Sequence, residues 1–190
     1  MIRSALDLTN ELTSFVRNSP KTDAALKRVT LAAGAGGGSL RPLCPTRWTF
    51  RTASLRSVVE NYEHVMITLE EVSSESSGEH ARREGEILAL MGQFETLMGL
   101  HMAIKTFSIA KDLSRGLQSA SATVGETQDA VGKVCERYGS MQTNESFSKM
   151  FWEAERDAEK LGIEGPKIPR KRKFPMRLGG DGEHHDSTVE

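Results

Sequence analysis

The chain has 190 residues, of which 37% are hydrophobic, and a formal net charge of −1 at neutral pH. This length suits one domain and is short for two large ones. A net charge near zero gives the chain as a whole no strong attraction to nucleic acid or to a membrane surface, and no stretch reaches the roughly 18 apolar residues that a membrane span requires.

Two helices are expected at the start of the chain. Apolar residues recur near helical spacing over residues 2–18, and Asn18-Ser19-Pro20 ends that helix. A second, short helix is predicted over residues 22–31, so residues 1–31 form an N-terminal helical segment. Residues 32–39 have the composition of a linker, and the prolines at 42 and 45 favour an extended chain. Residues 32–47 are therefore predicted to be a flexible linker.

The strongest periodic signal in the chain covers residues 51–72. Apolar residues there follow the i, i+3, i+4, i+7 spacing of one helix face, and either Thr49 or Thr52 is expected to cap the helix. The apolar positions are Leu55, Val58, Val59, Tyr62, Val65, Met66 and Leu69. A polar loop is predicted over residues 73–78.

Residues 79–118 are again helical in pattern, with Gly85, Gly92 and Gly99 recurring every seven residues. Each glycine costs a helix about 1 kcal/mol relative to alanine. The spacing places the glycines close to one face, where another helix could approach closely. The same stretch could also divide into two helices near Gly99.

Two more helices are predicted, over residues 123–138 and 145–161, and no run with strand periodicity is present. The predicted fold is all-α, an irregular bundle of about six helices with its main helical domain over residues 48–161. Residues 162–190 have no apolar period and are predicted to be a disordered tail, basic at first and acidic toward its end.

The sequence gives no indication of catalysis. We find no recognisable nucleophile with its base, no paired acids on rigid elements and no zinc signature, and Cys44 and Cys135 are read as reduced thiols. The many carboxylates are expected on solvent-facing helix surfaces. They include Glu60, Glu63, Glu70, Glu71, Glu79 and Glu84. No catalytic residue, metal site, cofactor or small-molecule substrate is therefore predicted.

The glycine-rich stretch and the histidines do not indicate a phosphate-binding or metal-binding site either. The glycine-rich stretch 34–39 lacks the strand and the terminal Lys-Ser/Thr of a phosphate-binding loop. His64, His80 and His101 stand alone and are interpreted as packed or solvated side chains. His184 and His185 lie among acidic residues, but nothing holds a metal site in place there.

The pair Arg47-Trp48 stands at the mouth of a predicted helix, directly after the linker. Tryptophan buries a large apolar body, and arginine pairs with carboxylates or phosphates. The pair therefore indicates either an anchor between helices or a contact with nucleic acid, and periodicity alone leaves both open.

A dense basic run follows the last predicted helix. Its members are Lys167, Arg170, Lys171, Arg172 and Lys173. Residues 1–164 carry 19 basic and 22 acidic residues, a net charge of −3, so the positive charge of the chain is concentrated in the tail. A proline-flanked run of this kind is typical of an import signal or of phosphate contacts, and a solubilising tail is the alternative. The expected location is nuclear, and otherwise cytoplasmic.

Several segments together resemble the hAT superfamily of transposases and the host proteins derived from them, including those of zinc finger MYM type. The resemblance covers most of residues 8–177. The quoted segments are Phe15-Val16-Arg17-Asn18-Ser19-Pro20-Lys21, Thr46-Arg47-Trp48, Arg51, Gly99-Leu100-His101, Phe147-Ser148-Lys149-Met150-Phe151-Trp152 and Lys167-Ile168-Pro169-Arg170-Lys171-Arg172-Lys173.

The resemblance implies an RNase H-like core interrupted by an all-helical insertion, with two Asp and one Glu holding divalent metal for DNA cleavage. Those acids would lie outside the 190 residues, and the chain would match only the insertion. The resemblance also implies that Trp48 lies near the transposon end, with Arg47 as a phosphate partner. Arg47, Trp48 and Arg51 are therefore the predicted nucleic-acid contacts. A fragment of this kind is not expected to cut DNA.

Three functions are therefore weighed. The first is a non-catalytic, transposase-derived helical fragment that binds nucleic acid or protein. The second is a helical interaction module that self-associates or docks on a full-length relative through the face of the helix at 51–72. The third is an active transposase subunit, which the missing acids disfavour.

Overall fold

The computed structural model describes residues 1–35, 38–43, 48–117 and 123–166, which form helices and no strand. The prediction of an all-α fold is confirmed. The eight described helices are α1 (Ile2–Asn18), α2 (Pro20–Ala32), α3 (Trp48–Glu60), α4 (Tyr62–Glu75), α5 (Glu79–Met91), α6 (Phe94–Leu117), α7 (Val124–Met141) and α8 (Asn144–Lys160). The predicted number of about six was too low, because two of the predicted helices are each divided in two.

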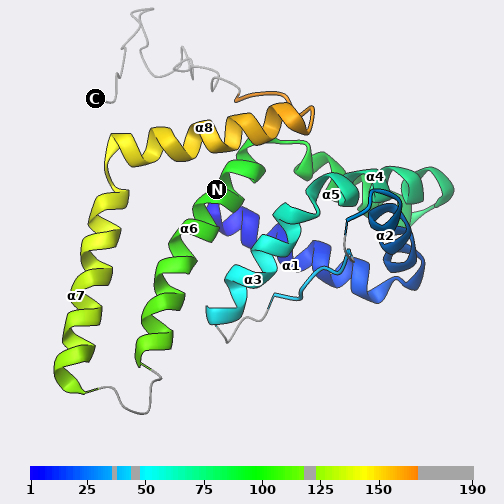
Figure 1. Ribbon diagram of the computed structural model, residues 1–190. Helices are drawn as coiled ribbons and strands as arrows, with labels where there is room; N and C mark the ends of the chain where they lie inside the picture. The colour runs from blue at the N-terminus through cyan, green and yellow to red at the C-terminus, as the bar shows by residue number, and fades with distance from the viewer. Residues whose placement is uncertain (36–37, 44–47, 118–122, 167–190) are drawn as a thin grey trace, which may run out of the picture.

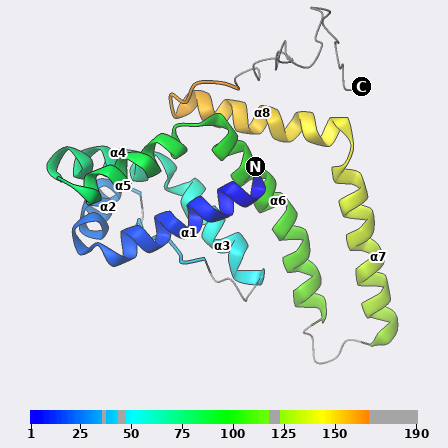
Figure 2. The same ribbon diagram turned by 180° about the vertical axis from the view of Figure 1, so that it is seen from behind.

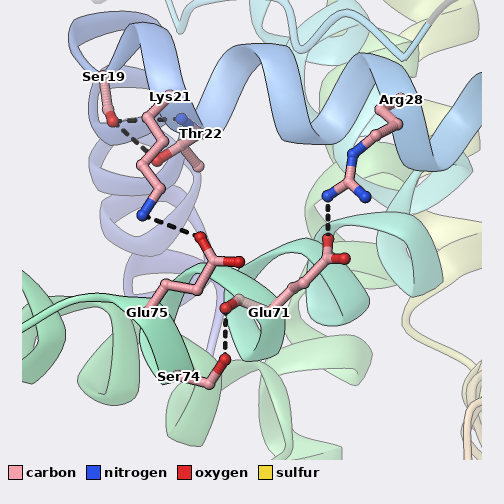
Figure 3. A network of polar contacts seen from close by, with 7 residues as sticks. All are labelled: Ser19, Lys21, Thr22, Arg28, Glu71, Ser74 and Glu75. Atoms are coloured by element: carbon pink, nitrogen blue, oxygen red, sulfur yellow. Dashed lines mark hydrogen bonds and ion pairs between the residues drawn. The ribbon is translucent and has the colours of Figure 1, made fainter.

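The first two helices lie where the sequence places them. Ser19 ends α1 and caps α2, since its Oγ accepts a hydrogen bond from the backbone N–H of Thr22 at 3.3 Å and Pro20 fits the first helical turn. Figure 3 shows how α2 then lies along α4, with Lys21 paired to Glu75 at 3.1 Å and Arg28 to Glu71 at 2.6 Å. Both pairs are exposed, so they add little stability.

The helix predicted over residues 51–72 is divided at Asn61. Asn61 has φ −108° and ψ 15°, and its side-chain amide donates to the carbonyl of Ser57 at 2.8 Å. Such local hydrogen bonding competes with the helix. The buried apolar row nevertheless continues across the break, through Leu55, Val58, Tyr62, Val65 and Leu69, which is why periodicity alone indicated one helix. Capping by Thr49 or Thr52 was wrong, because α3 already begins at Trp48.

The second division comes at Gly92, seven residues before the expected break near Gly99. The N–H of Gly92 donates to the carbonyl of Leu88 at 2.9 Å and ends α5, and the following helix is bent away by 71°. Gly99 lies inside α6 instead. A Cβ at Gly99 would come within 3.0 Å of the Met1 carbonyl oxygen, whereas one at Gly85 would meet nothing. Close helix approach is thus found at Gly99 and not at Gly85.

Helix α6 is the centre of the molecule. Figures 1 and 2 show it with α1 to α5 on one side and α7 on the other, and with α8 running across its start. Helices from before and after the linker share one core on the first side, which includes Ala5, Leu12, Leu26, Leu55, Leu69, Met91, Leu97 and Leu100. The buried Tyr62 hydroxyl donates to the carbonyl of Met91 at 2.7 Å and fastens α4 to the end of α5.

The described part of the linker lies against the helices. The N–H of Gly38 donates to Thr30 Oγ1 at 3.1 Å, and the backbone of Arg41 exchanges hydrogen bonds with Ser57 and Ser54 at 3.0 and 2.7 Å. At the other end, Ile163 is buried in the core although the expected disordered tail begins at residue 162. Residues 167–190 of that tail lie outside the described residues.

Candidate functional site

Most of the residues proposed to contact nucleic acid lie outside the described part of the chain. Arg47 and the basic run Lys167, Arg170, Lys171, Arg172 and Lys173 are among them. Trp48 is the first residue of α3, but its side chain is not described. The choice between an anchor and a nucleic-acid contact therefore stays open for Trp48.

Arg51 is the one member of that set whose side chain is described. It is half-buried on α3, and its guanidinium carbon lies 5.6 Å from the centre of the Phe107 ring of α6. A cation above an aromatic face is a favourable contact. Arg51 thus contributes to the packing of α3 on α6, and its contact with nucleic acid stays a prediction.

The histidines of the described residues do not gather into a metal site, and no group of three His, Cys, Asp or Glu side chains forms in that part of the chain. His80 is exposed, and His64 is half-buried. His101 of α6 lies with its Nε2 3.3 Å from an Asp157 carboxylate oxygen of α8. Burial lowers the pKa of His101, and the nearby carboxylates of Asp157 and Glu153 oppose that shift. His184 and His185 are outside the described residues.

One carboxylate expected on a solvent-facing surface is buried. Glu84 of α5 is only 2% exposed, and its Oε2 has no hydrogen-bond partner among the described residues. It shares the buried face of α5 with Ile87 and Met91, three and seven residues further on. That spacing was visible in the sequence, so helical periodicity could have placed Glu84 inside.

Helix α7 differs from the others because none of its residues is buried. It is well formed, with a capping box in which Thr123 and Glu126 bond each other's backbone; these hydrogen bonds from Thr123 also lower the pKa of Glu126. Among the described helices, α7 packs only against α6 and α8. The Tyr138 hydroxyl donates to the carbonyl of Thr106 at 3.0 Å, and Arg137 pairs with Asp112 at 3.0 Å.

The outer face of α7, defined by Val124, Val131 and Cys135, is exposed. Val124 is 77% and Val131 43% exposed, and Cys135 is exposed as well. Beside this row stand Gly125, Gly132 and Gly139, each facing open space. The apolar period of residues 123–138 predicted a helix there but did not show that this row would be exposed. The glycines, again seven residues apart, were the signal that could have distinguished the outer face.

Helix α8 also carries exposed aromatic side chains. Trp152 is 67% exposed and Phe147 is 48% exposed. Phe151 turns inward instead, and its ring packs edge-on against Phe94 with the two centres 5.4 Å apart. The aromatic pairing holds α8 across the start of α6.

A hollow of about 400 Å³ lies where α6, α7 and α8 meet. Its lining combines apolar side chains with several basic ones and three serines. The lining residues are Arg56, His101, Ile104, Lys105, Ser108, Ile109, Arg137, Ser140, Met141, Ser146, Met150 and Glu153. None of them had been proposed as a site residue, because they come from four different helices.

No protein-family model matches this sequence, and no solved structure matches its fold. The resemblance to hAT transposases therefore stays a prediction. No single described helix has the length and apolar character needed to cross a membrane, although the bent pair of Glu79–Met91 and Phe94–Ser114 passes the same test when taken together.

Proposed function

We propose that the protein is a non-catalytic helical binding module that self-associates through the outer face of α7. The observation that carries this proposal is an 18-residue helix without one buried residue, whose Val124 and Val131 are exposed on a common face. An amphipathic helix normally buries its apolar stripe. Pairing with a second copy would cover the part of the stripe that α6 leaves open.

The glycines beside the row support a close helix partner. Three glycines in one helix cost about 1 kcal/mol each relative to alanine, and Gly125, Gly132 and Gly139 all face open space within this molecule. Residues seven apart lie within about 20° of one another around a helix. The glycines therefore form a flat strip along which the backbone of another helix can approach closely.

The outer face carries no charge that would oppose its own copy. Gln128 shares the face of Val124 and Val131, whereas Asp129 and Lys133 lie about 160° around the helix from Val131 and point away from it. An uncharged face can meet a second copy of itself, and a two-fold, antiparallel pair centred on Val131 has the self-complementary contact of an isologous interface.

The non-catalytic part of the proposal rests on the sequence, which offers no nucleophile with its base and no paired acids on rigid elements. The resemblance to the helical insertion of hAT transposases supports it, because in that family the catalytic acids belong to the RNase H-like core and not to the insertion. Incubating DNA with the protein and Mg²⁺ or Mn²⁺ should give no nicking. Metal-dependent nicking by pure protein would overturn this part.

The self-association is tested by sedimentation velocity over a range of protein concentrations. The wild type should gain mass with concentration, and Val131→Lys should stay monomeric because it places two like charges at the centre of the pair. Lys149→Ala, at an exposed position of α8, is the matched control and should associate like the wild type. A wild type that stays monomeric at all concentrations would contradict the proposal.

Nucleic-acid binding is the second candidate, and the concentration of basic residues from Lys167 to Lys173 favours it. Contacts to phosphates release counterions, so the affinity should fall steeply with added salt. Replacing Lys171, Arg172 and Lys173 by alanine should weaken binding at every salt concentration. Absence of binding at low salt would remove this candidate.

A further inference from the structure

The hollow between α6, α7 and α8 lies on the opposite side of α7 from the outer face. Figure 1 shows these three helices framing one end of the molecule, and Arg56 of α3 reaches the same hollow. Its volume of about 400 Å³ is in the range of small-molecule pockets. The charge and polarity of the lining side chains indicate which kind of ligand would fit.

Basic side chains outnumber acidic ones around the hollow. Arg56, Lys105 and Arg137 stand against a single carboxylate, that of Glu153. Arg137 is already paired with Asp112. Arg56 has no ion pair among the described residues, and Lys105 has only one polar contact there, from its Nζ to the Ser146 hydroxyl at 3.3 Å. Neither cation has an ion pair, and Glu153 can offset only one of them, so the lining keeps an excess of positive charge.

Lys105 makes this excess significant because it is half-buried. An ammonium that loses part of its hydration without gaining a counter-ion is costly. The nearby acid Asp157 does not serve it, since the Asp157 carboxylate lies against His101, Arg156 and Lys160 at 3.3 to 3.8 Å. An anion entering the hollow would supply the missing charge.

Apolar side chains form another part of the wall of the hollow. Ile104, Ile109, Met141 and Met150 contribute side chains from three helices. Methionines adapt to the shape of a bound group. A ligand that fits both kinds of wall carries an acidic head group on an apolar body.

We propose that this hollow binds a small amphipathic anion. Lys105 and Arg56 hold its carboxylate or phosphate head group, and Ile104, Met141 and Met150 enclose its apolar body. The proposal does not depend on self-association, because no residue of the outer face lines the hollow.

Calorimetric titration with octanoate and with octyl phosphate tests the proposal. Both should bind at least about tenfold more tightly than 1-octanol, which lacks the charge, and than acetate or inorganic phosphate, which lack the chain. The tighter of the two amphiphiles identifies the preferred head group. Binding of acetate or inorganic phosphate as tightly as the amphiphiles would overturn the role of the apolar walls.

Substitutions inside and outside the hollow test whether the amphiphiles bind there. Lys105→Met keeps the length of the side chain and removes its charge, so it should weaken both amphiphiles about tenfold. Lys133→Met, at an exposed position of α7 outside the hollow, should leave the affinity unchanged, and Arg56→Met provides a second test if Lys105→Met melts early. Unchanged affinity in a folded Lys105→Met or Arg56→Met protein, or no heat with wild type, would overturn the proposal.

Discussion

Glu84 illustrates how one residue can oppose the packing around it. The buried positions that follow it in the helical period, Ile87 and Met91, are apolar, and Glu84 is buried with them. A buried carboxylate oxygen without a partner loses its hydration and gains no hydrogen bond in exchange, which costs free energy. The residue therefore weakens the contact of α5 with the rest of the core.

Replacing Glu84 by methionine should stabilise the protein. The side chain keeps its length and loses its charge, so the free energy of unfolding should rise by about 1–3 kcal/mol. Urea denaturation measures this change. Glu86→Met, at an exposed position of the same helix, is the control and should change stability by no more than about 0.5 kcal/mol. A loss of stability in Glu84→Met would show that the carboxylate has a favourable partner.

His101 makes stability depend on pH. Burial holds its folded-state pKa below the ordinary value of 6.5, so the unfolded chain takes up the proton first as the pH falls. The contribution of neutral His101 is therefore present above about pH 6.5 and is lost as the pH falls through the folded-state pKa. The wild type should lose more stability between pH 8 and pH 5 than His101→Gln does, as urea midpoints would record. His80→Gln, at an exposed site, should follow the wild type; an identical pH response of His101→Gln would contradict the assignment.

At the scale of helices, two glycines of the same sequence period occupy opposite environments. A Cβ at Gly85 would meet open space, and one at Gly99 would press on Met1 and on the Ala5 side chain at 3.0 to 3.1 Å. Gly85→Ala should raise the free energy of unfolding by about 0.5–1 kcal/mol, because alanine favours the helix. Gly99→Ala should gain nothing, since α1 must shift to admit the methyl group. Thermal melts of the two variants compare them directly, and an equal gain would mean that α1 does not approach α6 at Gly99.

The ends of helices could be predicted where the signal is local. Ser19 with Pro20 fixes the junction of α1 and α2, and Thr123 fixes the start of α7 through its capping box. The breaks at Asn61 and Gly92 escaped prediction because the apolar period runs on through both. At Asn61 the side-chain hydrogen bond to Ser57 is local, but an Asn or a Gly within an apolar period does not by itself end a helix. The tertiary contacts around the breaks, such as the hydrogen bond from Tyr62 to Met91, have no signature in the local sequence.

The candidate sites were predicted less completely than the fold. The basic run and the pair Arg47-Trp48 could be found because their residues are neighbours in the sequence. The hollow could not, because Arg56 and Lys105 come together only when α3 and α6 have packed against each other. The exposed row of α7 escaped for a related reason, since a sequence pattern does not reveal how much of an apolar stripe its neighbours cover.

At the scale of the whole molecule, the arrangement is asymmetric. The body formed by α1 to α5 encloses its core against α6, whereas α7 is supported by α6 and α8 alone and buries none of its residues (Figure 2). Exposed apolar rows of this kind mark interaction surfaces. A second copy seated on the outer face would give α7 the burial that the other helices already have.

Disulfide formation across the proposed two-fold axis tests this most directly. Val131→Cys, in a chain with Cys44→Ser and Cys135→Ser, places a thiol at the centre of the antiparallel pair, where the Cα atoms of a disulfide must come within about 7 Å. Under mild oxidation it should form a covalent dimer on a non-reducing gel, at protein concentrations where the equally exposed control Leu90→Cys stays monomeric. Equal cross-linking of both variants, or none in Val131→Cys, would contradict self-association through α7.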